Sequence, residues 1–113
     1  MTRKEFEKLL QGALKSLPKE FKAKLRNVDV VIKDGPAEGR VMGLYEGVTL
    51  KDRIGGDYSL IVHDRITLFK RAIEKECSAK GLDIRQEIRR TLLHEIAHHF
   101  GIPDNRLADL DIY

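Results

Sequence analysis

The sequence predicts one small domain that contains both helices and strands. Three observations support this prediction: helical patterns of apolar residues lie towards both ends of the chain, short β-branched segments lie between them, and glycine and proline clusters separate the segments. The 113 residues fit a single domain over residues 1–113 and leave little room for a second. With 42% hydrophobic residues, the chain can bury a core.

The charge and cysteine content narrow the class of protein. The net charge of +3 is mildly basic, basic and acidic residues are interleaved, and aromatic residues are few. We therefore expect no nucleic-acid partner. No stretch is apolar enough for a membrane span or a signal peptide, and Cys77 is the only cysteine, which rules out an internal disulfide. The expected compartment is the cytoplasm, whereas the sequence carries no sign of an oligomeric state.

A helix is expected at the N-terminus. Thr2 and Glu5 have the spacing of a capping box, and apolar residues follow at helical spacing up to Leu17. Pro18 is expected to break or kink this helix, or to start a second one that carries Phe21. We expect the whole segment to cover a sheet.

Short strands are expected in the middle of the chain. The segment Val28 to Lys33 is β-branched, and a turn cluster follows at residues 34–39. The segment from Gly47 to Asp57 contains three glycines and alternating charges, so we expect a long loop there. The further strand candidates are residues 41–45, 59–63 and 66–70.

Two helices are expected after the strands. The first covers residues 71–80 and is closed by Gly81. The second begins near Asp83, which makes a capping signal with Gln86, and it stops at Gly101. Its first turns are rich in arginine, so burial should deepen towards its C-terminal half. Its apolar residues are Ile88, Leu92, Leu93, Ile96, Ala97 and Phe100.

The second of these helices carries the motif His94-Glu95-Ile96-Ala97-His98. Residues four apart lie on one face of a helix, with Cβ atoms roughly 5–6 Å apart. His94 and His98 can therefore bind one zinc ion, with Zn–N distances of about 2.0–2.1 Å. Glu95 lies about 100° round the helix from His94. It can hydrogen-bond a water on the metal, which is the position of a general base.

A third ligand is needed, because catalytic zinc takes three protein ligands and leaves one position for water. Gly101 can end the helix in a left-handed conformation and turn the chain back across the metal. Asp104, three residues later, is then the expected oxygen ligand, although it could instead cap a short following helix. Asp109 and Asp111 are the reserve candidates. We expect one zinc ion per chain.

The full run, His94-Glu95-x-x-His98-x-x-Gly101-x-x-Asp104, resembles the extended signature of zincin metalloproteases whose third ligand is an aspartate. More narrowly, the chain resembles the small bacterial minimal zincin family of metallopeptidases. The resemblance implies an α+β, zincin-like fold, in which a small mixed sheet packs against a long N-terminal helix and the motif helix. It also implies zinc, held by His94, His98 and Asp104, with Glu95 as the catalytic base. The matching segments are residues 43–47, 64–69 and 89–107.

The predicted function is a zinc-dependent metallopeptidase that acts on a peptide or protein substrate. The resemblance supplies no identity for that substrate. The alternative is a zinc-stabilised interaction module without efficient catalysis. Two departures from larger zincins motivate it: no methionine follows the third ligand, and only nine residues follow Asp104.

Several other side chains admit both a structural and a functional interpretation. His99 lies about 100° round the helix from His98, so we expect it either to pack or to support the metal ligands without contacting the metal. His63 is expected to be a surface or core histidine, and Cys77 a plain helix thiol. Tyr45 could be a packed aromatic, or it could place its phenol near the metal to stabilise an oxyanion. The arginines expected on a solvated face are Arg85, Arg89 and Arg90.

Overall fold

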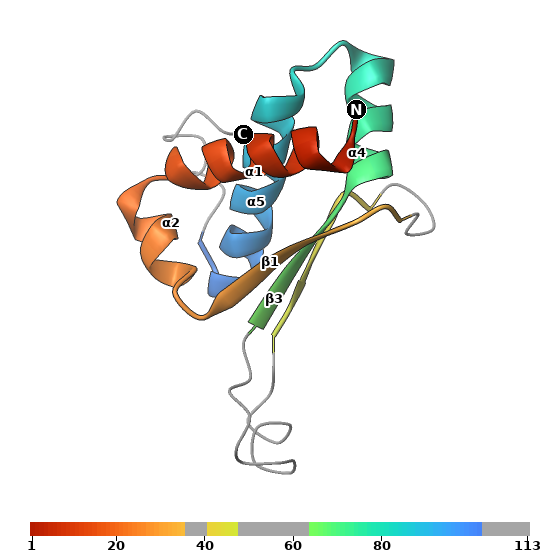
Figure 1. Ribbon diagram of the computed structural model, residues 1–113. Helices are drawn as coiled ribbons and strands as arrows, with labels where there is room; N and C mark the ends of the chain where they lie inside the picture. The colour runs from red at the N-terminus through yellow and green to blue at the C-terminus, as the bar shows by residue number, and fades with distance from the viewer. Residues whose placement is uncertain (36–40, 48–63, 103–113) are drawn as a thin grey trace.

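The computed structural model describes residues 1–35, 41–47 and 64–102. This part of the chain forms a three-stranded mixed sheet and four helices (Figure 1), which confirms the predicted α+β fold class. The elements are α1 (Arg3–Lys15), α2 (Lys19–Lys24), β1 (Val28–Lys33), β2 (Gly43–Glu46), β3 (Asp64–Phe69), α4 (Lys70–Lys80) and α5 (Ile84–Phe100).

The N-terminal helix begins with the predicted capping box. The Thr2 hydroxyl accepts a hydrogen bond from the backbone N–H of Glu5 at 3.1 Å, and the Glu5 carboxylate accepts one from the backbone N–H of Thr2. Helix α1 ends at Lys15, and Pro18 caps the separate helix α2, so the predicted break is confirmed. The buried side chains of the two helices are Phe6, Leu10, Ala13 and Phe21.

The sheet has the strand order β1-β3-β2, with β1 parallel and β2 antiparallel to β3. The predicted strand at residues 66–70 starts two residues earlier, at Asp64, and the one at residues 41–45 is shifted to Gly43–Glu46. The strand candidate at residues 59–63 lies outside the described residues. The expected loop at residues 47–57 also lies outside the described residues, except for Gly47.

The last two helices end as the sequence predicts. Gly81 and Gly101 adopt left-handed conformations with φ of 65° and 68°. Glycine reaches this conformation without the strain that a Cβ atom causes, and this explains both helix ends. At the start of α5, the Asp83 carboxylate accepts a hydrogen bond from the backbone N–H of Arg85 at 3.2 Å.

Burial along α5 is deepest in the middle of the helix, from Glu87 to Ala97. The apolar residues that were predicted to be buried in the C-terminal half are buried at Leu92, Leu93, Ile96 and Ala97. The prediction is wrong for Phe100 in the last turn, which is 39% exposed. Aromatic rings and one lysine side chain contact Phe100. Its ring makes an edge contact with Tyr45 of β2, and the Lys24 ammonium of α2 lies 4.7 Å from its centre.

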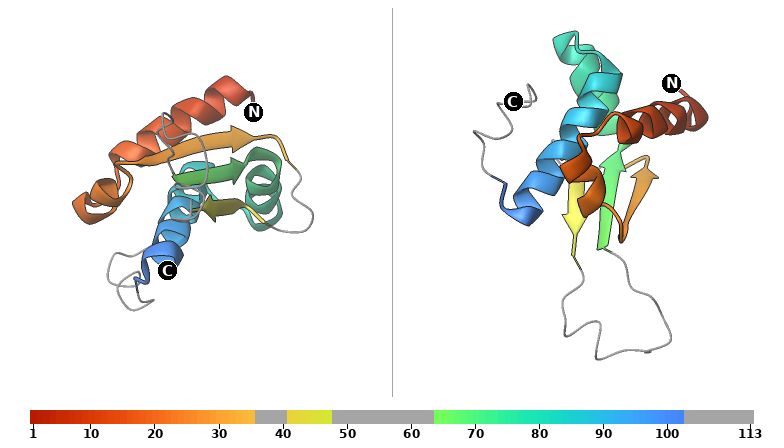
Figure 2. Two further views of the ribbon diagram at one scale, coloured as in Figure 1. Left: turned by 90° about the horizontal axis from the view of Figure 1, so that it is seen from below. Right: turned by 90° about the vertical axis from the view of Figure 1, so that its left-hand side faces the viewer.

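Helix α5 is the central element of the fold. It packs against β2 and β3, and α1 packs across it (Figures 1 and 2). The core between these elements includes Ile66 and Leu68 of β3 and Leu92 and Ile96 of α5. Because α5 is held from both sides, side chains on its remaining face have well-defined positions.

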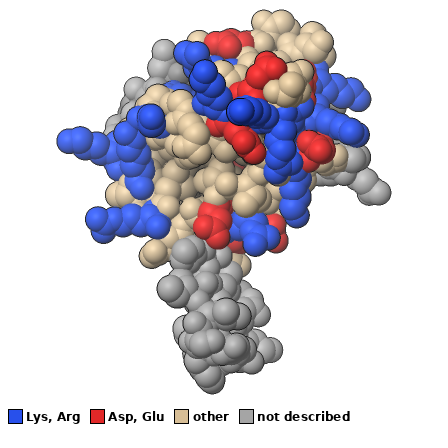
Figure 3. Space-filling model, in the orientation of Figure 1, with Lys and Arg blue, Asp and Glu red and all other residues tan. Residues whose placement is uncertain are grey.

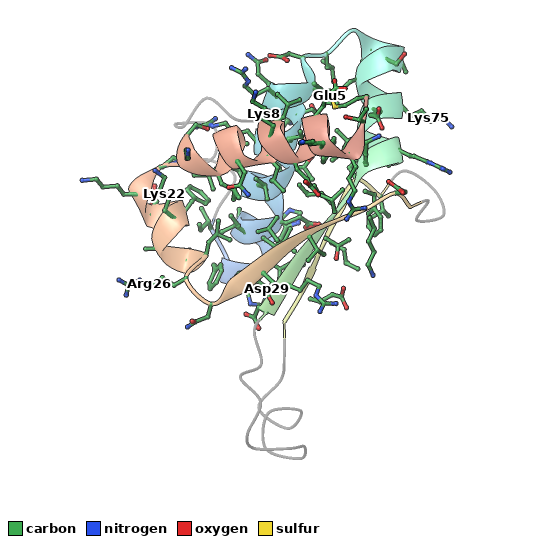
Figure 4. The ribbon with its side chains drawn as sticks, viewed as in Figure 1. Glu5, Lys8, Lys22, Arg26, Asp29 and Lys75 are labelled. Carbon is green, nitrogen blue, oxygen red and sulfur yellow. The ribbon has the colours of Figure 1, made fainter. Side chains whose placement is uncertain are left out.

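The outer surface is charged. Basic and acidic side chains lie among one another on the face shown in Figure 3. Lys22, Arg26 and Lys75 extend away from the ribbon in Figure 4. No helix in the described residues is long and apolar enough to cross a membrane.

Strand β2 comes very close to α5 at Gly43, where a Cβ atom would lie 2.7 Å from the Thr91 methyl carbon. Because Thr91 is buried, we expect Gly43→Ala to push the two elements apart and to lower the free energy of unfolding by about 1–3 kcal/mol. Urea unfolding measures this effect. Gly12→Ala in α1 is the control, because nothing lies within 4 Å of its added Cβ, and it should not destabilise. Equal stability of Gly43→Ala and the parent would contradict the close approach.

Candidate metal centre

Helix α5 brings the two motif histidines together on one face. Their ring centres lie 6.3 Å apart, with an interplanar angle of 80°. Two imidazoles that bind one zinc ion at about 2.0–2.1 Å place their ring centres roughly 5–6 Å apart. The observed ring separation is slightly larger than that range.

The two histidines differ in exposure. The Nε2 atom of His94 is buried and has no hydrogen-bond partner among the described residues, although the imidazole has other interactions, including a contact with the His98 ring. His98 is exposed on the last turn of α5. One imidazole thus lies inside the fold and the other at its surface, so that an ion between them would be reachable from solvent.

Glu95 lies beside this pair and is half-buried. Burial raises the pKa of its carboxyl group, and the charge of His98 acts in the opposite direction. Its Cγ atom is also close to strand β2, 3.4 Å from where a Cβ atom on Gly43 would be. A carboxylate with a raised pKa is suited to accept a proton from water.

The raised pKa of Glu95 predicts a pH-dependent stability of the metal-free protein. A carboxyl whose pKa is higher in the folded state stabilises the fold below its unfolded pKa, and this contribution is lost as the pH rises through the folded pKa. The Glu95→Gln variant has no carboxyl group at this position, so its stability does not fall in this way as the pH rises. We therefore expect the melting temperature of the variant to exceed that of the parent by more near pH 7 than near pH 4, in thermal denaturation with a chelator present. A difference that does not change with pH would contradict the raised pKa.

A pocket of about 420 Å³ opens along the same side of α5. We call it the α5 pocket. Its walls come from α5, from the C-terminal half of α4 and from the start of β2, and His94, Glu95 and His98 all line it. Pockets of this size hold small ligands or short segments of larger ones. The two candidate ligands and the candidate base therefore face a space that a substrate can enter.

Tyr45 and His99 form a separate cluster beside the candidate metal centre. Their rings stack at 3.8 Å with an interplanar angle of 13°. The Tyr45 hydroxyl donates a hydrogen bond to Asp64 at 2.9 Å, and His99 Nε2 lies 3.9 Å from the same carboxylate oxygen. His99 thus packs, which is one of the two roles expected for it. The Tyr45 phenol is directed at Asp64, a partner that sequence reasoning did not identify.

The predicted third ligand lies outside the described residues. Asp104, its reserves Asp109 and Asp111, and also His63 belong to segments about which the structure says nothing further. Among the described residues, no group of three His, Cys, Asp or Glu side chains is arranged to hold a metal ion. His94 and His98 are the described part of the predicted ligand set, and Asp104 stays a prediction.

Cys77 is a buried free thiol on α4, as predicted. Burial raises its pKa, and the nearby carboxylates of Glu87, Asp83 and Glu76 raise it further. A thiol in such surroundings is a poor nucleophile and a poor metal ligand. We therefore assign Cys77 no part in the candidate metal centre.

Comparisons with known proteins agree with this interpretation of the fold and motif. A solved structure of a conserved hypothetical protein from Thermus thermophilus is similar to the chain, with a TM-score of 0.61 and 26% sequence identity; the match covers 93% of this chain and 99% of that one. No curated protein matches the chain. The sequence model of a family described as zincin-like metallopeptidase matches residues 25–113, which include the whole motif. The chain therefore belongs to the zincin-like metallopeptidase family.

Proposed function

We propose that this protein is a zinc-dependent peptidase that cleaves peptide bonds in a peptide or protein substrate. In this proposal His94 and His98 hold the zinc ion, and Asp104 is the third ligand. The observation that carries the proposal is that both imidazoles and the Glu95 carboxylate line one pocket. Donors of this kind suit zinc, and the family to which the chain belongs implies zinc in general.

Zinc and Glu95 have different roles in the proposed reaction. When bound, zinc makes water more acidic and polarises the carbonyl group of the substrate. Glu95 accepts a proton from the water while the water oxygen forms a bond to the carbonyl carbon of the substrate. The carbon–nitrogen bond breaks, and Glu95 returns the proton to the leaving amine. The raised pKa of Glu95 supports both transfers, because the carboxyl must take up the proton and then give it back.

A digest of a peptide library tests this proposal. The zinc-loaded protein is expected to cleave a subset of the peptides, and a chelator should stop the cleavage. Mass spectrometry identifies the products and so defines the scissile bonds. If no peptide is cleaved although the protein carries its full complement of zinc, the proposal is wrong. The alternative of a zinc-stabilised interaction module would then be favoured.

The compartment is part of the proposal. We place the protein in the cytoplasm, where thiols stay reduced, because its single cysteine is a buried free thiol. Cell fractionation of the organism that makes it, with an antibody against the chain, measures this. Recovery in an extracellular or envelope fraction would contradict the assignment.

A further inference from the structure

The α5 pocket continues beyond the histidines towards the N-terminal half of α5. Glu87 lines this distal end, seven residues before His94. Seven residues span two turns of helix, or about 10 Å along the axis. The pocket therefore connects the candidate metal centre to a second carboxylate that the proposed chemistry does not use.

Glu87 is unusual for a carboxylate, because only 6% of the residue is exposed. Its side chain makes no hydrogen bond or ion pair with any described residue, although its backbone carbonyl accepts a hydrogen bond from the Thr91 hydroxyl. Glu87 lines the pocket, so a positively charged group that enters it can reach the carboxylate. A carboxylate with no ion-pair partner of its own can form a charge-assisted hydrogen bond with such a group.

The other charged side chains of the pocket do not supply such a group. Lys80 forms an ion pair with Glu76 at 2.5 Å, and 61% of its side chain is exposed. Arg90 is exposed, so its guanidinium group is hydrated and compensates little of the negative charge of Glu87. Among the residues that the structure describes, the most buried charged group at this end of the pocket is therefore the Glu87 carboxylate.

We propose that the distal end of the α5 pocket is a specificity site for a positively charged substrate group, which Glu87 binds. The chemical class is the ammonium or guanidinium group of a lysine or arginine side chain close to the scissile bond. The distance fits, because each extended residue spans about 3.3–3.6 Å and a long basic side chain adds to that reach. This inference rests on the proposed peptidase function.

Binding of matched peptides tests the inference without turnover. The probe peptides are identical except at one position, which is lysine, norleucine or glutamate, and the protein is the zinc-loaded Glu95→Gln variant. Isothermal titration calorimetry is expected to show that the lysine peptide binds at least about tenfold more tightly than the norleucine peptide. A difference in affinity of this size is expected from one charge-assisted hydrogen bond. Equal affinities, no binding of any peptide, or a preference for glutamate would each overturn the inference.

Two further variants, made on the Glu95→Gln background, assign the preference to one carboxylate. Glu87→Gln keeps the size of the side chain and is expected to bring the lysine and norleucine peptides within about twofold of each other. Glu76→Gln is the matched control, because Glu76 lines the same pocket but already has Lys80 as its partner. It should keep the preference. A lysine preference that survives in folded, zinc-loaded Glu87→Gln would overturn the role of Glu87. The peptide series with an intact Glu87 decides the charge preference even if Glu87→Gln does not fold.

Cleavage of the same peptides by the parent protein separates the inference from the function on which it rests. Cleavage of the lysine and norleucine peptides with equal kcat/KM would overturn the inference and leave the peptidase proposal standing. A lysine preference in binding, with no cleavage of any peptide, would overturn the peptidase proposal. The charged pocket would then belong to a binding module.

Discussion

Replacement of His94 by alanine is expected to reduce the zinc content from about one ion per chain to nearly none. A site with three protein ligands and a water cannot keep a tetrahedral ion tightly when one of its imidazoles is missing. Metal analysis by mass spectrometry, on protein purified without an affinity tag, measures the loss.

The neighbouring His99 gives a matched control. It is on the same helix, but its ring stacks on Tyr45 and its Nε2 atom lies near Asp64. His99→Ala should therefore keep its zinc. If His94→Ala also keeps its zinc, or if the parent binds none, then His94 and His98 are packing residues and the metal centre is wrongly assigned.

The same measurement decides which aspartate completes the ligand set. Asp104→Ala is expected to lose zinc, whereas Asp109→Ala and Asp111→Ala should retain it. Zinc loss in one of the reserve variants, with Asp104→Ala unaffected, would move the third ligand to that position. These variants test a ligand that sequence spacing predicts and that lies beyond the described residues.

The helices could be predicted closely because their signals are local. The Thr2 capping box, the Pro18 break and the two glycines at 81 and 101 each act within a few residues of the chain. Helix boundaries consequently fall within one or two residues of their predicted places. The motif histidines were predictable for the same reason, since a spacing of four on a helix fixes their common face.

The pairings between distant segments could not be predicted in this way. Nothing in the composition of β1 shows that it pairs in parallel with β3, or that β3 is the central strand. The exposure of Phe100 depends on which other elements reach the end of α5. Apolar character alone predicted burial there, and tertiary packing decided otherwise.

For a related reason, the positions of the polar side chains around the candidate metal centre could not be predicted from the sequence. Glu87 sits among arginines at the start of α5 and would be expected on a solvated face, yet only 6% of it is exposed and it lines a pocket together with residues of α4. Asp64 is adjacent to Tyr45 only because β2 and β3 pair in the observed register. The roles of both residues depend on tertiary packing, and no short sequence motif predicts either of them.

Replacement of Glu95 by glutamine is expected to leave the zinc content unchanged and to lower the rate of peptide cleavage by about 10²–10⁴-fold. Glutamine has nearly the same shape and can still hydrogen-bond water, but it cannot accept the proton that the attacking water must lose. Because Glu95 lies about 100° from His94 on the helix, the loss of its charge should not remove a ligand. The rate constant kcat, measured on a peptide that the parent cleaves, shows the effect.

The zinc content of the same preparation separates this explanation from loss of the metal. Zinc bound as in the parent, with cleavage nearly abolished, is the result expected of a general base. The loss should appear in kcat rather than in KM, because the missing proton transfer belongs to the chemical step and not to the binding of the peptide. A Glu95→Gln variant that cleaves as fast as the parent would remove Glu95 from the mechanism. Another residue would then have to accept the proton.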